Sequence, residues 1–141
     1  MLEQESFWAA KCYVVVTDKT KPAMRMTIDE LTMTGKKVFV VDMSDKPEPG
    51  TFRGVSELPS EVDYAVIGLT KVNAANVIEE LKIKGAKRFW IHWRTDTPEV
   101  KKKCTEPGIQ CITGRCPMMY LSRGLNVHSI HRRFAKLLGK Y

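Results

Sequence analysis

Most hydrophobic residues of the chain fall into short unbroken runs, and the segments between these runs carry hydrophobic residues at helical spacing. The first run, Tyr-Val-Val-Val-Thr, is rich in β-branched residues and does not alternate with polar ones. Such a run is typical of a strand buried on both faces, as in the centre of a parallel sheet. The strands that we expect cover residues 13–17, 37–42, 62–69, 88–93 and 109–113, with a short edge strand at 52–56.

The segments between and after the strands predict helices. The helices that we expect cover residues 24–34, 73–85, 97–104 and 127–138. Gly35 ends the first of them, and Thr97 with Pro98 opens the third as its N-cap and first helical residue. Strands that alternate with helices predict a three-layer α/β/α fold with a central parallel sheet of five to six strands.

The length of 141 residues fits one domain, and we expect a single unit over residues 1–141. Its last helix, 127–138, has apolar residues on one face and His, Arg and Lys residues on the other. The apolar face would be buried either on the sheet or against a second copy of the chain in a homodimer.

The expected sheet has a reversal of strand order at its centre. Right-handed crossovers place the first strand between residues 37–42 on one side and residues 62–69 on the other. Ligands of open α/β sheets bind in the crevice at such a reversal, beyond the carboxyl ends of the strands. The loops that meet at this edge are 17–22, 43–44, 69–73, 92–96 and 114–118.

The composition fits a folded protein that stays in the cytoplasm. Hydrophobic residues make up 43% and charged residues 28% of the chain, which argues against disorder. No apolar run is long enough to cross a bilayer, and residues 1–10 lack the basic start of a signal peptide. We therefore expect a cytoplasmic location without a membrane partner.

The formal net charge of +7 and the isoelectric point near 9.3 favour an anionic partner. A nucleotide, a CoA-like ligand and a nucleic acid all fit that description, as does a basic surface that is merely solvated. The four cysteines are expected to be reduced in a cytoplasmic chain. Their spacing contains no Cys-x-x-Cys pair, so we expect no structural metal.

Polar residues after the first strand are the first candidates for a ligand site. Thr17, Lys19 and Thr20 offer hydroxyl and backbone donors with one cation, which a phosphate requires, although an ordinary surface loop has the same composition. Arg25, on the first turn of the next helix, either binds an anion there or is simply solvated.

Further candidates follow the other strands at the same edge. Leu69, Thr70 and Asn73 precede the helix across the crevice, where Asn73 serves equally well as a plain N-cap. His92 ends a strand and is either a hydrogen-bonded structural histidine or a ligand contact. Arg115 follows the last strand.

Three segments of the chain resemble one protein family. They are Gly114-Arg115-Cys116-Pro117-Met118-Met119-Tyr120, similar to a Gly-x-Cys-Pro-Met-Met signature, Arg88-Phe89-Trp90-Ile91-His92, and the closing helix from His128 to Leu137. With the order of segments, they make the chain similar to the small stand-alone CoA-binding proteins of Rossmann type, over nearly its whole length. The resemblance implies a Rossmann-like fold and a ligand such as CoA or acyl-CoA, ahead of NAD or another nucleotide.

The chain departs from the family pattern at the phosphate-binding turn. A Gly-x-Ser turn is usual there, and Val16-Thr17-Asp18 stands in its place. Asp18 adds a negative charge where a diphosphate would lie, which nearby cations must outweigh. The second strand ends in Asp42-Met43 where Asn-Pro is usual, and an acid at this position resembles the ribose reader of NAD sites.

We interpret the chain as a binding or regulatory module that holds CoA or a related nucleotide at the crevice without chemistry of its own. The residues assigned to ligand binding are Thr17, Asp18, Lys19, Thr20, Arg25, Asp42, Met43, Leu69, Thr70, Asn73, His92 and Arg115. One alternative is a thiol-dependent enzyme that uses Cys116, activated by Arg115 or His92. Another is an interaction or nucleic-acid-binding protein that has lost its ligand, but the sequence has no recognised nucleic-acid motif.

Overall fold

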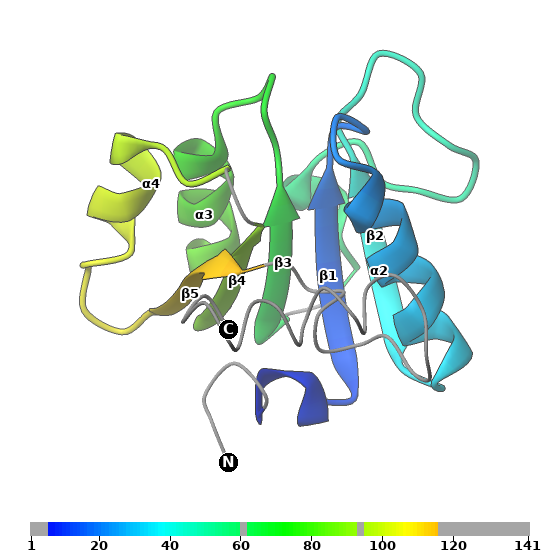
Figure 1. The fold of residues 1–141 in the computed structure, drawn as a ribbon, viewed down its shortest axis with the longest axis horizontal. Helices are drawn as coiled ribbons and strands as arrows, with labels where there is room; N and C mark the ends of the chain where they lie inside the picture. The colour runs from blue at the N-terminus through cyan, green and yellow to red at the C-terminus, as the bar shows by residue number, and fades with distance from the viewer. Residues whose placement is uncertain (1–5, 60–61, 93–94, 116–141) are drawn as a thin grey trace, which may run out of the picture.

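The computed structural model describes residues 6–59, 62–92 and 95–115 (Figure 1). The helices and strands, in chain order, are η1 (Phe7–Ala9), β1 (Cys12–Thr17), α2 (Pro22–Met33), β2 (Lys37–Asp42), η2 (Val55–Glu57), β3 (Tyr64–Gly68), α3 (Ala74–Ile83), β4 (Arg88–His92), α4 (Pro98–Lys103) and β5 (Gln110–Arg115). The expected helix 127–138 lies outside the described residues, and so does the proposed dimer contact through it.

The five strands form one parallel sheet in the order β2-β1-β3-β4-β5. This confirms the Rossmann-like α/β fold, and β1 lies between β2 and β3 as the crossover rule predicts. In register, Thr17 at the end of β1 is beside Asp42 on one neighbour and Gly68 on the other. The carboxyl ends of these three strands therefore meet at one edge of the sheet.

Helices cover both faces of the sheet, so alternate side chains of β1 are buried on opposite sides. Val14 and Val16 belong to the core cluster that contains the apolar residues of α3 and Val100 of α4. Tyr13 and Val15 belong to a second cluster, with the buried residues of α2 and the aromatic residues of η1. The unbroken hydrophobic run thus corresponds to a strand that is buried on both faces.

The expected edge strand at residues 52–56 is wrong, because only Phe52 pairs with the sheet. Its backbone N–H donates to the Val40 carbonyl, and its carbonyl accepts the Asp42 N–H, both at 2.8 Å. Gly54 has an extended backbone and is the N-cap residue of η2, and this short helix places Val55 in the core. A strand that continued past Phe52 would carry Val55 along the sheet edge instead.

The expectation that all cysteines are reduced is also wrong. Cys104 at the end of α4 and Cys111 in β5 form a disulfide with their Cα atoms 5.6 Å apart, while Cys12 is free. The short connection from α4 to β5 brings the two residues together. The expectation of reduced cysteines rests on the redox state of the cytoplasm, which does not indicate whether two cysteines lie close together in the fold.

Gly68 ends β3 at a point where the adjacent helix leaves no space for a side chain. A Cβ atom there would clash with the Met24 Sδ and lie only 2.5 Å from its Cγ. We expect Gly68→Ala to lower the free energy of unfolding by about 1–2 kcal/mol, because buried Met24 must move to another rotamer. Urea denaturation measures the change. Gly54→Ala is the control, since its nearest contact would be an ordinary 4.0 Å, and an equal loss in both variants would contradict the explanation.

Candidate functional site

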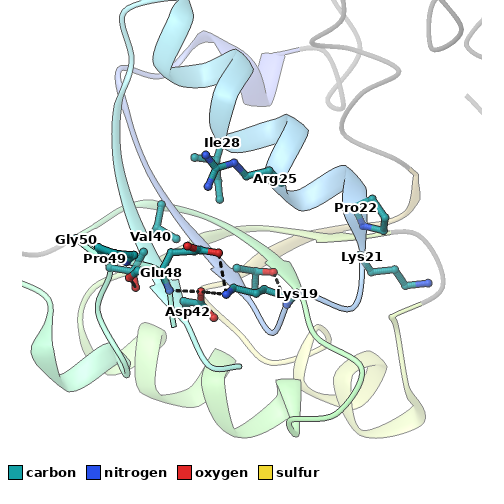
Figure 2. Close-up of a pocket in the computed structure, with 12 residues that line it drawn as sticks. Lys19, Lys21, Pro22, Arg25, Ile28, Val40, Asp42, Glu48, Pro49 and Gly50 are labelled. Atoms are coloured by element: carbon teal, nitrogen blue, oxygen red, sulfur yellow. Dashed lines mark hydrogen bonds and ion pairs between the residues drawn. The ribbon is translucent and has the colours of Figure 1, made fainter. Parts of the chain in front are cut away.

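Two hollows open beside the turn that follows β1. The α2-side hollow has a volume of about 340 Å³ (Figure 2). It is lined by Thr17, Lys19, Lys21, Pro22, Arg25, Ile28, Val40, Asp42, Glu48, Pro49, Gly50 and Thr51. The crevice hollow has a volume of about 600 Å³ and is lined by Asp18, Lys19, Thr20, Met43, Ser44, Asp45, Lys46, Lys71 and Val72. Lys19 lines both, so the two hollows meet at this residue.

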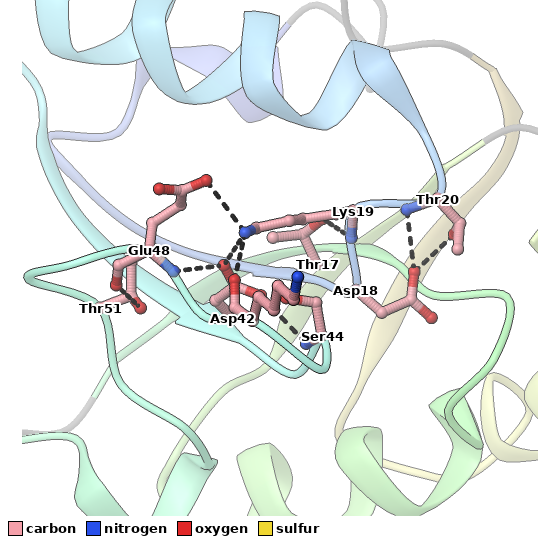
Figure 3. A network of polar contacts seen from close by, with 9 residues as sticks. Thr17, Asp18, Lys19, Thr20, Asp42, Ser44, Glu48 and Thr51 are labelled. Atoms are coloured by element: carbon pink, nitrogen blue, oxygen red, sulfur yellow. Dashed lines mark hydrogen bonds and ion pairs between the residues drawn. The ribbon is translucent and has the colours of Figure 1, made fainter.

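Lys19 combines an unusual backbone with a fully engaged side chain. Its φ of +65° lies in the left-handed region, and its N–H donates to the Thr17 hydroxyl at 3.0 Å. Its ammonium group lies 2.9 Å from the Glu48 carboxylate and 3.6 Å from that of Asp42 (Figure 3). The hydrogen bond to Glu48 is the main reason that the pKa of Lys19 is raised above its ordinary value. The cation of the turn is thus paired within the protein.

Asp42 organises the loop after β2. Its side chain is 2% exposed, and its two oxygens accept the backbone N–H groups of Ser44 and Glu48, each at 3.0 Å. Burial acts to raise the pKa of Asp42, but the hydrogen bonds from Ser44 and Glu48 outweigh it and hold this pKa below its ordinary value. The acid that resembles a ribose reader therefore supports a loop in this structure, and its ligand role stays a prediction.

Asp18 lies against the loop that follows β3, with 4% of the residue exposed. Its Oδ2 accepts the backbone N–H groups of Thr70 at 2.9 Å, Lys71 at 2.8 Å and Val72 at 3.4 Å. Its Oδ1 accepts the backbone N–H and the hydroxyl of Thr20. Burial acts to raise the pKa of Asp18, and these hydrogen bonds, that of the Thr20 hydroxyl first, reverse the effect and lower it. The negative charge expected beside a diphosphate is therefore held by the protein's own donors.

The other candidates on the β3 side have structural partners. The Thr70 hydroxyl donates to the Thr20 hydroxyl at 2.6 Å across the crevice. Asn73 is the N-cap of α3 and accepts the Ala75 N–H at 3.0 Å, which confirms the N-cap interpretation. Leu69 is buried in the core, and Met43 is partly buried against the same core cluster.

The remaining candidates lie farther along the sheet. His92 ends β4 and is buried, and its carbonyl accepts the backbone N–H and the hydroxyl of Thr95. Arg115 ends β5 opposite His92, but its side chain lies outside the described part of the structure. Cys116 also lies outside the described residues, so the thiol alternative stays a prediction. The structure thus groups the candidates of β1, β2 and β3, and places His92 at the end of another strand.

The start of α2 differs from the start of α3. Helix α2 begins with Pro22, and Lys21, its N-cap residue, makes no side-chain capping bond within the described structure. Arg25, on the first turn, has a side chain that is 70% exposed, and its Nε lies 3.4 Å from Asp29. Figure 2 shows Arg25 and Ile28 reaching from α2 over Lys19 and Asp42, while Lys21 extends away from them. The Met24 N–H donates to the Lys21 carbonyl at 3.0 Å, but no described side chain caps the helix, and the dipole of its amino end favours a negative charge.

Sequence reasoning missed the loop that closes the α2-side hollow. Glu48, Pro49 and Gly50 form its wall opposite α2. The available signal was that this segment follows β2 and so begins at the same edge as residues 17–22. The hydrophobic residues at 52–56 favour an edge strand and give no indication of a loop that lines a site.

Within the residues described, every helix is too short or too polar to span a bilayer. In the same ranges, no group of three or more His, Cys, Asp and Glu side chains is arranged to hold a metal ion.

The chain is similar to known proteins in sequence pattern and in fold. A model of the family described as "CoA binding domain" matches residues 13–122. None of the curated protein sequences matches the chain significantly.

Several solved structures share the fold. Prb, the PH1109 protein redesigned for binding, has a TM-score of 0.69 and 19% identity, over 100% of this chain and 96% of that one. A hypothetical protein from Pyrococcus horikoshii has a TM-score of 0.68 and 21% identity, over 84% and 89% of the two chains. A conserved hypothetical protein from Pyrococcus furiosus has a TM-score of 0.63 and 23% identity, over 76% and 96%.

Proposed function

This chain belongs to the CoA-binding domain family, and we propose that it binds CoA or a related nucleotide-type ligand at the carboxyl edge of β1, β2 and β3. The observation that carries the proposal is the amino end of α2, which has no side-chain cap among the described residues and lines one of the two hollows that share Lys19. A nucleotide with a long diphosphate-linked arm suits such a pair of hollows better than a compact ligand does.

The α2-side hollow suits the adenosine part of the ligand. Ile28, Val40 and Pro49 give it apolar walls for a base, and its volume of about 340 Å³ lies within the usual range of ligand pockets. The Arg25 guanidinium at its mouth can donate to a phosphate, and the end of α2 adds a favourable dipole. The arm of the ligand would then extend past Lys19 into the crevice hollow.

We further propose that the protein is a binding or regulatory module without chemistry of its own. Asp18 and Asp42 both accept backbone N–H groups, and their pKa values are lowered. A carboxylate with a depressed pKa is a weak general base near neutral pH. Lys19 is protonated and paired with Glu48, so it is not available as a nucleophile.

Thermal melting of the full chain with CoA, dephospho-CoA, NAD and ATP tests the proposal. Binding to the folded state raises the melting temperature by mass action, and we expect CoA to raise it most. If millimolar concentrations of all four ligands leave the melting temperature unchanged, the proposal is wrong.

Replacing Arg25 with alanine tests the placement of the ligand. We expect Arg25→Ala to weaken CoA binding about tenfold, because one charge-assisted hydrogen bond to phosphate is lost. Isothermal titration calorimetry measures the affinity. Lys87→Ala is the matched control, since it removes one positive charge at the opposite edge of the sheet, just before β4. An equal loss in both variants would indicate an effect of net charge rather than a contact.

A further inference from the structure

The loop between β3 and α3 has the geometry of an anion-binding site. Three consecutive backbone N–H groups, those of residues 70–72, converge on one oxygen, the Oδ2 of Asp18, at 2.9, 2.8 and 3.4 Å. Successive N–H groups that point to one place form a concave site for an anion. Here the anion is a side chain of the same molecule.

Both oxygens of the Asp18 carboxylate accept hydrogen bonds that fix its position. The Thr70 hydroxyl donates to the Thr20 hydroxyl, which in turn donates to the Asp18 Oδ1. The backbone N–H of Thr20 adds a bond at 3.3 Å to the same oxygen. Asp18 itself is only 4% exposed, whereas Thr70 and Lys71 are exposed residues, so the carboxylate is buried beneath a loop that solvent reaches.

A phosphate cannot use the same donors while the carboxylate is there. The three N–H groups would have to leave Asp18 unpaired and buried beside a second negative group, which is strongly unfavourable. At the other side of the turn, the first turn of α2 contains no acidic residue and carries Arg25, and the Glu48 carboxylate in the hollow beside it is paired with Lys19. The two ends of the turn therefore differ in their capacity for phosphate.

We propose that Asp18 is a specificity-determining residue, whose carboxylate takes the place of a phosphate on loop 70–72 and excludes ligand phosphates from it. Phosphate groups of the CoA-type ligand then bind at the α2 end of the turn, a placement that rests on the proposed function. The exclusion by Asp18 does not depend on that function and applies to any phosphate.

Inorganic phosphate and the full-length Asp18→Ala variant provide the test. Removal of the carboxylate leaves the three N–H groups free, and we expect phosphate to bind them at least about tenfold more tightly than it binds the wild type. In ¹⁵N–¹H spectra, phosphate should move the amide signals of Thr70, Lys71 and Val72 in the variant and leave them in place in the wild type. Chloride at matched ionic strength controls for general salt effects.

Asp18→Asn serves as the filled control, because its amide still occupies the loop and should keep phosphate out. If Asp18→Ala is unfolded in buffer, it is refolded with phosphate or with chloride, and recovery of the folded circular dichroism spectrum in phosphate alone is the expected result. The proposal is overturned if phosphate neither shifts these amides nor restores folding in Asp18→Ala, or if it shifts them equally in the wild type. Because no CoA is used, this failure is distinct from a failure of the CoA titration.

Discussion

Asp18→Ala is expected to lower the free energy of unfolding by about 3 kcal/mol. The substitution leaves the N–H groups of residues 70–72, whose bonds to Asp18 are partly buried, without their shared acceptor. An unpaired donor that is shielded from water costs about 1–3 kcal/mol. Water reaches part of the loop through the crevice hollow and offsets some of this cost. Urea denaturation followed by circular dichroism measures the loss. Asp45→Ala, which removes an exposed aspartate in the next loop, should change stability by less than about 0.5 kcal/mol.

The pH dependence of the same contact has a definite sign. The pKa of Asp18 is lower in the folded protein than its ordinary value of 3.8, so its stabilisation is present above pH 3.8 and is lost as pH falls through the folded pKa. Asp18→Asn has no such titration. The stability difference between the wild type and Asp18→Asn should therefore be constant near neutral pH and become smaller below about pH 4. A difference that stays constant down to pH 2 would contradict the role assigned to the carboxylate.

Reduction of the Cys104–Cys111 disulfide is expected to lower the free energy of unfolding by about 2.5 kcal/mol. The bond joins residues seven positions apart, and closing a loop of this size restricts the unfolded chain by about that amount. Melting temperatures with and without a thiol-free reductant measure the effect.

Two variants separate this effect from reduction elsewhere in the chain. The double variant Cys104→Ser with Cys111→Ser should melt at the temperature of the reduced wild type and should not respond to reductant. Cys12→Ser, which alters the free cysteine of β1, should respond as the wild type does. A wild type whose melting temperature is the same under both conditions would show that the bond does not stabilise the fold.

The fold could be predicted from the sequence because its strands and helix ends are marked by residues close together in the chain. Each buried strand is a short hydrophobic run, and helix starts such as Thr97-Pro98 and Asn73 use side chains that contact backbone only two or three residues away. Crossover handedness then fixed the position of β1. Residues 52–56 were misjudged because a single bridge at Phe52 and a full strand have the same local composition.

The candidate site could be predicted only in part. A parallel sheet brings the ends of β1, β2 and β3 together, so the proximity of Thr17, Asp42 and Thr70 follows from topology. The partners of the Asp18 Oδ2 lie 52 to 54 positions away, and the orientation of the side chain depends on N–H groups whose direction is set by the fold of loop 70–72. The disulfide likewise depends on how α4 and β5 are placed. No local pattern carries this information.

The left-handed backbone at Lys19 limits how the turn after β1 can change into a glycine turn during evolution. A glycine there would remove the conformational cost of φ +65°, yet Asp18 would still occupy the loop after β3. A small residue at position 18 would empty that loop, yet the lysine would still hold the turn to Glu48 and Asp42. Neither substitution alone produces an open glycine turn, so the two positions must be altered together to reach one.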